Sequence, residues 1–490
     1  MLWMNRALDF LEAVTPVALL LAGVYFAVRL RFFFVLHPRR LLRGLFGKKK
    51  TTAVDAGVAG KPPSPFRAAC IAMAGTIGVG NITGVSLALL TGGPGAIFWM
   101  WICAFAAMLL KYAEITLSMD SREELPHGGY IGGTPVTLRR AGHAALGALF
   151  AALCLGYTVL VGGVVQANAI SACLFDCFGC PPVICGLLLA AVTAPLICLR
   201  TEKTAALTAR LVPLMCLLYI GMSFAVLALR AGEIPGAFAR IFRGAFGLSS
   251  AAGGVCGYGA SRAIRIGAAR GLMSNEGGCG TAPMAHVTSE ETVPARQGLW
   301  GIFEVFADTV VICTLTALVI LVAFPEMPSG LNESALARLA FVTVLGPFSG
   351  NLLALSLSLF AFATILCGAF YGRTCLQFFT TSATARRGYL VLYTLLLYVG
   401  AVSLPSAVWR LTDLLLSVMT LLNLTLLIKK ADRVKTLTAA YGLIGRCGEN
   451  KAAQATRVFR RPSAVRPDGE RKNLAKSMEH TSRHPLRQQE

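Results

Sequence analysis

Two apolar stretches of the chain are interrupted by glycines and small polar residues, at 75–84 (GTIGVGNITG) and 271–281 (GLMSNEGGCGT). Lipid supplies no water to backbone groups that leave a helix, so irregular backbone at membrane depth persists only around a buried site or a water-filled cavity. The free N–H groups at the start of a half-helix suit a carboxylate, and the free carbonyl oxygens at the end of one suit a small cation. One such break in each half of a chain is typical of a transporter's binding site.

Polar side chains in both breaks could contact a ligand. The neutral ones are Thr76, Asn81, Thr83, Ser274 and Asn275. The charged one is Glu276, and an ionisable group inside a membrane segment indicates a functional role. Glu276 could neutralise a cation, pair with Arg270, or cap the half-helix that follows. The alternative reading of the first break is close helix packing through its small residues.

The composition is that of a membrane protein. Of 490 residues, 55% are hydrophobic and 14% are charged, and the mean hydropathy is +0.65; soluble domains carry about 25% charged residues. Eleven apolar segments approach the roughly 20 residues that cross a bilayer. They are 14–36, 68–91, 94–119, 146–173, 183–200, 208–229, 251–290, 298–324, 343–372, 388–405 and 407–428. We therefore expect an all-α polytopic membrane protein with about eleven transmembrane helices.

The breaks divide these segments into one plus five plus five. Each set of five opens with an interrupted member, which predicts an inverted 5+5 repeat whose two broken helices face each other near the middle of the membrane. The expected parts are an extra N-terminal helix in 1–36, a basic loop in 37–67, repeats in 68–229 and 230–428, and a basic tail in 429–490. The tail is expected to be largely disordered from about 446, because it is polar and basic.

The net charge of +21 is carried between the hydrophobic segments and in the tail. This distribution fits a positive-inside bias and not a nucleic-acid surface. The basic loop 37–67 is expected on the cytoplasmic side, which places the N-terminus outside and the C-terminus in the cytoplasm. The expected surroundings are a lipid bilayer, with no nucleic-acid partner, and the sequence carries no signal for an oligomeric state.

Several motifs resemble one known family. They are GNITGV at 80–85, GGPGAIFWMW at 92–101, KYAE at 111–114, AARGLMSNE at 268–276, APMAH at 282–286 and DTVVICTLTAL at 308–318. Together they resemble the sodium:alanine (alanine or glycine:cation) symporters of bacteria and archaea, over roughly residues 65–430.

The resemblance implies an amino-acid/sodium symporter core of ten helices plus one extra helix, in a bacterial plasma (inner) membrane. It implies sodium-coupled import of alanine or glycine, no enzymatic activity, and no cofactor beyond the co-transported sodium. The substrate residues that it implies, with those of the second break, are Thr76, Gly80, Asn81, Gln166, Asn275, Gly277 and Thr364. Sodium is expected at Thr364 and the backbone oxygens around Gly75 and Gly78.

The chain departs from the family at Cys367-Gly368, where a Gly-Trp pair is usual. Loss of the indole is expected to open the pocket wall, so that a residue larger than alanine fits. A proton-coupled amino-acid transporter and a passive channel or facilitator for small solutes remain alternatives. An intramembrane enzyme is disfavoured, because the chain has no HExxH or GxSxG motif.

Other ionisable residues give weaker expectations. Lys111 and Glu114 are predicted to form a local surface pair, and His286 is predicted to be a solvated histidine. Glu304 and Asp308 share one helical face, so that one of them pairs with an arginine of 251–270 (Arg265 or Arg270) or both belong to a structural polar network. Arg262 and Arg265 either lie deep in lipid or face a water-filled vestibule.

Overall fold

The computed structural model describes residues 2–47, 62–125, 128–246, 253–328, 330–403 and 406–444. Part of the basic loop and the tail from 445, including the region expected to be disordered, lie outside these residues. The described chain is almost wholly helical, with one short antiparallel hairpin of β1 (Glu123–Glu124) and β2 (Tyr130–Ile131). It is an all-α polytopic membrane protein, as predicted.

Six helices of the described residues are long and apolar enough to cross a membrane, and the bent pair Pro65–Thr76 and Gly80–Gly92, which meet at 53°, adds a seventh. The six are Gly95–Ser121, Ala144–Phe178, Thr201–Leu229, Pro294–Ala323, Phe348–Phe379 and Arg410–Lys429. Shorter apolar helices at Val14–Arg29 and Pro182–Ile197, together with α13 (Gly253–Asn275) and α19 (Ala383–Val402), occupy the other expected segments.

The remaining elements follow in chain order. They are α1 (Leu2–Arg29), α2 (Phe33–Leu36), α3 (Pro38–Phe46), α4 (Pro65–Thr76), η1 (Gly80–Gly84), α5 (Val85–Gly92), α6 (Gly95–Ser121), α7 (Thr134–Arg140), α8 (Ala144–Val159), η2 (Leu160–Val165), α9 (Gln166–Phe178), α10 (Pro182–Ile197), α11 (Thr201–Leu229), η3 (Ala231–Glu233), α12 (Ile234–Phe246), α14 (Pro283–His286), α15 (Pro294–Val305), η4 (Phe306–Cys313), α16 (Thr314–Ala323), α17 (Glu333–Leu345), α18 (Phe348–Phe379), α20 (Ser406–Lys429) and α21 (Ala431–Ala440).

Both predicted breaks are present. The first separates α4 from η1: Ile77 leaves the helical region (φ −78, ψ 90), and a wide turn from Gly80 re-enters the helix. The second follows α13, where Glu276 adopts a left-handed conformation (φ 48) that residues with a side chain rarely take. Strained backbone of this kind clusters at ligand sites and switches, so Glu276 marks the second break as more than a loop.

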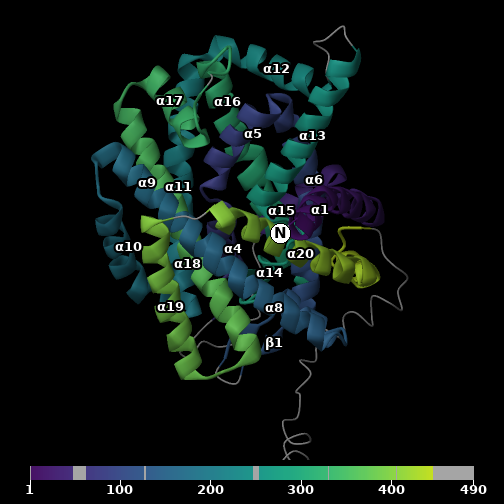
Figure 1. Ribbon diagram of the computed structural model, residues 1–490. Helices are drawn as coiled ribbons and strands as arrows, with labels where there is room; N and C mark the ends of the chain where they lie inside the picture. The colour runs from purple at the N-terminus through teal and green to yellow at the C-terminus, as the bar shows by residue number, and fades with distance from the viewer. Residues whose placement is uncertain are drawn as a thin grey trace, which may run out of the picture.

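The helices pack in two groups around the breaks. Helix α6 contacts α13, α15, α1 and α12, whereas α18 contacts α8, α9, α4 and α11. In Figure 1, α12 and α17 lie at one end of the molecule and β1 at the opposite end, with α4 and α18 between them. The first broken segment therefore lies where these two groups meet.

Gly368 lies in a tight helix crossing and not at a pocket wall, so the expectation of an opened pocket there is wrong. A Cβ at Gly368 would lie 2.8 Å from Gly162 Cα, 2.9 Å from the Tyr393 hydroxyl and 3.1 Å from Thr158 O. The space beside Gly368 is filled by the η2 backbone and by Tyr393 of α19. Sequence comparison missed this because Tyr393 and Gly162 are distant in the chain.

Gly368→Ala is expected to destabilise the protein by about 1–3 kcal/mol, because overpacking forces two backbones apart. The measurement is the free energy of unfolding in detergent. Gly221→Ala on α11 is the control: no described atom lies within 4 Å of the added Cβ, so stability should hold or rise through helix propensity. Equal stability of Gly368→Ala and the wild type would contradict the packing described above.

Candidate functional site

The first break lies against α18. A Cβ at Gly78 would lie 3.1 Å from Thr364 Oγ1, and one at Gly75 would lie 2.7 Å from Cys367 Sγ. Thr364 Oγ1 donates to Phe360 O at 3.1 Å and is buried, which leaves its oxygen lone pairs free toward the break. The structure thus brings together Gly75, Gly78 and Thr364, the three residues expected to hold sodium.

Asn81 closes the first break and reaches the second half of the chain. Its Oδ1 accepts from Gly78 N at 3.0 Å, and its Nδ2 donates to Asp308 Oδ1 at 2.6 Å. Asn81 is fully buried, so both bonds are shielded from solvent. The side chain expected to bind substrate therefore also fixes the turn in which it lies.

Asp308, in η4, is the point at which the two breaks meet. Its Oδ2 accepts from Ser274 Oγ and from Thr309 Oγ1, each at 2.8 Å, while Asn81 occupies Oδ1. One buried carboxylate is thus bonded to η1, to the end of α13 and to its own neighbour. The expectation of a polar network at Asp308 agrees with these contacts.

The second break is held by its own side chains. Asn275 Oδ1 accepts from Gly277 N at 2.9 Å, and Asn275 Nδ2 donates to Thr309 Oγ1 at 3.3 Å. Glu276 accepts from the Tyr157 hydroxyl and from Thr281 Oγ1, each at 2.6 Å. Glu276 therefore joins the break to α8, a contact that the sequence did not predict.

Lys111 and Glu114 are buried in α6, so the predicted surface pair is wrong. Lys111 Nζ forms an ion pair with Glu304 Oε1 at 3.0 Å and donates to Asn275 O at 2.8 Å. Glu114 Oε2 accepts from Gly280 N at 3.0 Å and from Asn423 Nδ2 at 2.8 Å. Both residues of α6 thus hold the backbone of the second break.

Glu304 connects this ion pair to the first break. Its Oε1 also accepts from Thr76 Oγ1 at 3.1 Å, so Thr76 points toward α15 and not toward Thr364. Its Oε2 lies 3.2 Å from His286 Nε2. The pair Lys111–Glu304 therefore ties the ends of α4 and α13, the two half-helices that precede the breaks.

His286 is fully buried, which corrects the expectation of a solvated histidine. Gln297 Nε2 lies 3.3 Å from Pro65 O, a pure acceptor, and 2.8 Å from His286 Nδ1. Because Gln297 donates to both atoms, Nδ1 is an acceptor and the imidazole is neutral, with its proton on Nε2 facing Glu304. His286 thus links α14 to α15 and to the start of α4.

Two predicted substrate residues keep unused capacity. Gly80 is exposed, and no described atom lies within 4 Å of a Cβ placed there. Gln166, at the start of α9, is 6% exposed, and its Oε1 has no hydrogen-bond partner among the described residues. Helix α9 packs on α18, the helix of Thr364, so Gln166 lies on the α18 side of the site.

Arginines flank the site. Arg262 and Arg265 are exposed on α13, so neither is buried in the bundle, and the ion-pair partner of Glu304 is Lys111. Arg122, beyond α6, donates to the carbonyl oxygens of Val287 and Ser289 at 3.0 and 2.7 Å. Burial lowers the pKa of the Arg122 guanidinium, which anchors the chain that follows α14.

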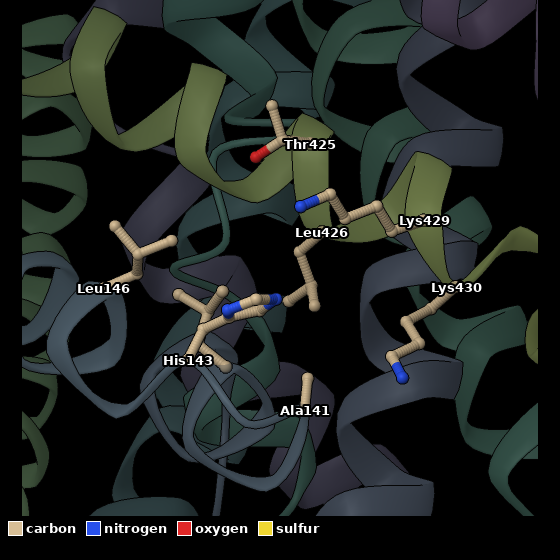
Figure 2. Close-up of a pocket in the computed structure, with 8 residues that line it drawn as sticks. Ala141, His143, Leu146, Thr425, Leu426, Lys429 and Lys430 are labelled. Atoms are coloured by element: carbon tan, nitrogen blue, oxygen red, sulfur yellow. The ribbon is translucent and has the colours of Figure 1, made fainter.

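A cavity of about 120 Å³ lies away from the breaks, where α7 and α8 meet the end of α20 (Figure 2). Its labelled walls include His143, Leu426, Lys429 and Lys430. No residue expected to bind substrate or sodium lines it, so it takes no part in the candidate site.

Sequence reasoning missed Lys111, Glu304 and His286 as members of the site. The available signal was the cost of an ionisable group within an apolar segment, which was applied to Glu276 but not to Lys111. No group of three or more His, Cys, Asp or Glu side chains suited to a metal ion occurs in the part of the chain that the structure describes. Its cation ligands must therefore be mainly neutral oxygens.

Comparison with known proteins agrees with this architecture. Residues 3–455 match the model of the sodium:alanine symporter family. The probable sodium/glutamine symporter GlnT of Bacillus subtilis is 34% identical over 422 residues, which cover 85% of each chain. The sodium/alanine symporter AgcS of Methanococcus maripaludis is 33% identical over 435 residues, which cover 87% of this chain and 94% of that protein. A manganese transporter of Eremococcus coleocola aligns with a TM-score of 0.51 at 12% identity, over 85% of this chain and 88% of its own, and so shares the fold.

Proposed function

Because the chain belongs to the sodium:alanine symporter family, we propose that it imports a small neutral amino acid, with alanine or glycine first, together with sodium. The observation that carries the proposal is the meeting of both breaks at one buried polar cluster, where Asn81 and Ser274 bond to Asp308. A family of transporters also agrees with the expectation that the chain is not an enzyme.

The amino acid is held between the breaks and the helices α9 and α18. Its contacts come from Thr76, Gly80, Asn81, Gln166, Asn275, Gly277 and Thr364. Of these, Gly80 offers open backbone and Gln166 offers a buried acceptor without a partner among the described residues. We therefore assign the ammonium of the amino acid to Gln166 Oε1. Its carboxylate is assigned to the backbone N–H groups at the start of η1, where the helix dipole favours an anion.

Sodium is held by Thr364 Oγ1 and by backbone oxygens around Gly75 and Gly78. These residues lie together where the first break faces α18, and oxygen ligands are those that hard cations take. The site bridges a broken helix and the α8–α9–α18 group. Its occupancy therefore favours one arrangement of the two groups over the other.

Transport then proceeds by alternating access. The repeats 68–229 and 230–428 move relative to one another around the fixed site, in a bacterial plasma membrane with the N-terminus outside and the C-terminus in the cytoplasm. Relatives carry the names of both a sodium/alanine and a sodium/glutamine symporter, so the side chain accepted is ranked by competition among alanine, glycine, serine and glutamine.

Thr364→Ala is expected to raise the sodium concentration for half-maximal uptake by about tenfold, as loss of a contact of about 1.4 kcal/mol does. Thr364→Ser keeps the hydroxyl and should stay near wild type. The measurement is the sodium dependence of labelled alanine uptake into proteoliposomes. An unchanged sodium dependence in the alanine variant would remove Thr364 from the sodium site.

A further inference from the structure

Asp308 is a buried carboxylate that lies between the two breaks. Three neutral donors contact it: Asn81 Nδ2 at 2.6 Å, Ser274 Oγ at 2.8 Å and Thr309 Oγ1 at 2.8 Å. Asn81, Thr309 and Asp308 are 0% exposed, and Ser274 is 5% exposed. The wide helical turn η4 on which Asp308 lies is a form found most often at functional sites.

The charges of the surrounding core do not balance. Within the membrane-spanning region of the described chain, the buried ionisable side chains include four carboxylates, Glu114, Glu276, Glu304 and Asp308, and one ammonium, Lys111. Lys111 forms its ion pair with Glu304 and directs its other contact to Asn275 O. A buried charge is stable only when it is paired, so this core has room in its charge balance for a further cation.

The groups around Asp308 suit a small hard cation. Asp308 Oδ2, Ser274 Oγ and Thr309 Oγ1 are all oxygens, and both hydroxyls keep lone pairs after donating to the carboxylate. Oxygen-only ligand sets are typical of hard cations, whereas softer metals take nitrogen or sulfur. Gly80 provides open space one residue before Asn81, and this space is the route by which an ion reaches the cluster.

We infer that Asp308, with the hydroxyls of Ser274 and Thr309, binds a second sodium ion between the two breaks. The inference rests on the proposed function, which uses the neutral site at Thr364. The Asp308 site differs because it contributes a full negative charge and because its partners belong to both broken helices. A cation there draws η1 and the end of α13 onto one point, and each amino acid is then imported with two sodium ions.

Asp308→Asn tests this inference, since it removes the charge while keeping the shape. The wild type is expected to import two sodium ions per amino acid with a sodium Hill coefficient of about 2, and the variant one ion with a coefficient of about 1, because the Hill coefficient is bounded by the number of sites. The measurement is the ratio of labelled sodium to labelled alanine taken up by proteoliposomes. The control is Asp120→Asn, whose carboxylate pairs with Arg433 at 2.7 Å outside the spans; its ratio should match the wild type.

A wild-type ratio of one sodium ion per amino acid would overturn the inference, and this result needs no variant to fold. Equilibrium binding of labelled sodium to the purified protein separates the two proposals. Two bound ions in the wild type, with one lost in Asp308→Asn and the other in Thr364→Ala, would support the second site even if alanine is not the substrate. Two bound ions in Asp308→Asn would place the second ion elsewhere.

Discussion

Lys111→Met is expected to destabilise the folded protein by about 3–5 kcal/mol and to abolish uptake, because it leaves Glu304 buried without its cation. Lys111 and Glu304 are each 0% exposed and lie 3.0 Å apart, so water cannot replace the lost partner. The same change frees Asn275 O, which Lys111 holds at 2.8 Å, and so loosens the end of α13. The measurement is the free energy of unfolding in detergent, with uptake measured in parallel.

The double variant Lys111→Met/Glu304→Gln should recover much of this stability, since a buried pair can often be replaced by neutral residues without loss. It should recover little transport, because neither break is then held by the pair. Arg433→Met is the matched control: its partner Asp120 is partly exposed, so the loss should stay near 1 kcal/mol or below. Near wild-type stability of Lys111→Met alone would contradict the buried pair.

Gln166→Ala is expected to weaken amino-acid binding by about tenfold to a hundredfold, the effect of losing a hydrogen bond to a charged group. Stability should change little, because Gln166 Oε1 has no partner to lose among the described residues. The KM for alanine and the unfolding midpoint are measured together. A lower stability with an unchanged KM would make Gln166 a structural residue.

Asn168→Ala provides the comparison for Gln166, since it lies on the same helix. Asn168 Nδ2 donates to Gly400 O at 3.2 Å on α19, so its amide already serves helix packing. We expect a modest loss of stability and an unchanged KM for alanine. The opposite pattern in the two variants separates a ligand contact from a packing contact on one helix.

Local patterns predicted the breaks and the helices. Glycines and small polar residues within apolar segments mark the ends of α4 and α13, because such residues neither continue a helix well nor tolerate lipid. The proximity of Gly78 to Thr364 followed from the family resemblance, not from spacing. Whether these residues bind substrate and sodium stays a prediction.

Contacts between distant helices were beyond local patterns. Lys111 and Glu114 fit the i, i+3 rule for a surface pair, yet the partner of Lys111 is Glu304, on a helix almost two hundred residues away. His286 shows the same limit, since its environment is made by Gln297, Glu304 and the start of α4. The wide turns η2 and η4 also carry no sequence signal that propensity alone could detect.

The most direct test of the account is uptake of labelled alanine and glycine into proteoliposomes, with and without an inward sodium gradient. The account predicts accumulation above the external concentration that requires the sodium gradient and disappears when sodium is equal on both sides. Accumulation driven by a proton gradient without sodium, or equilibration without accumulation, would contradict sodium-coupled symport.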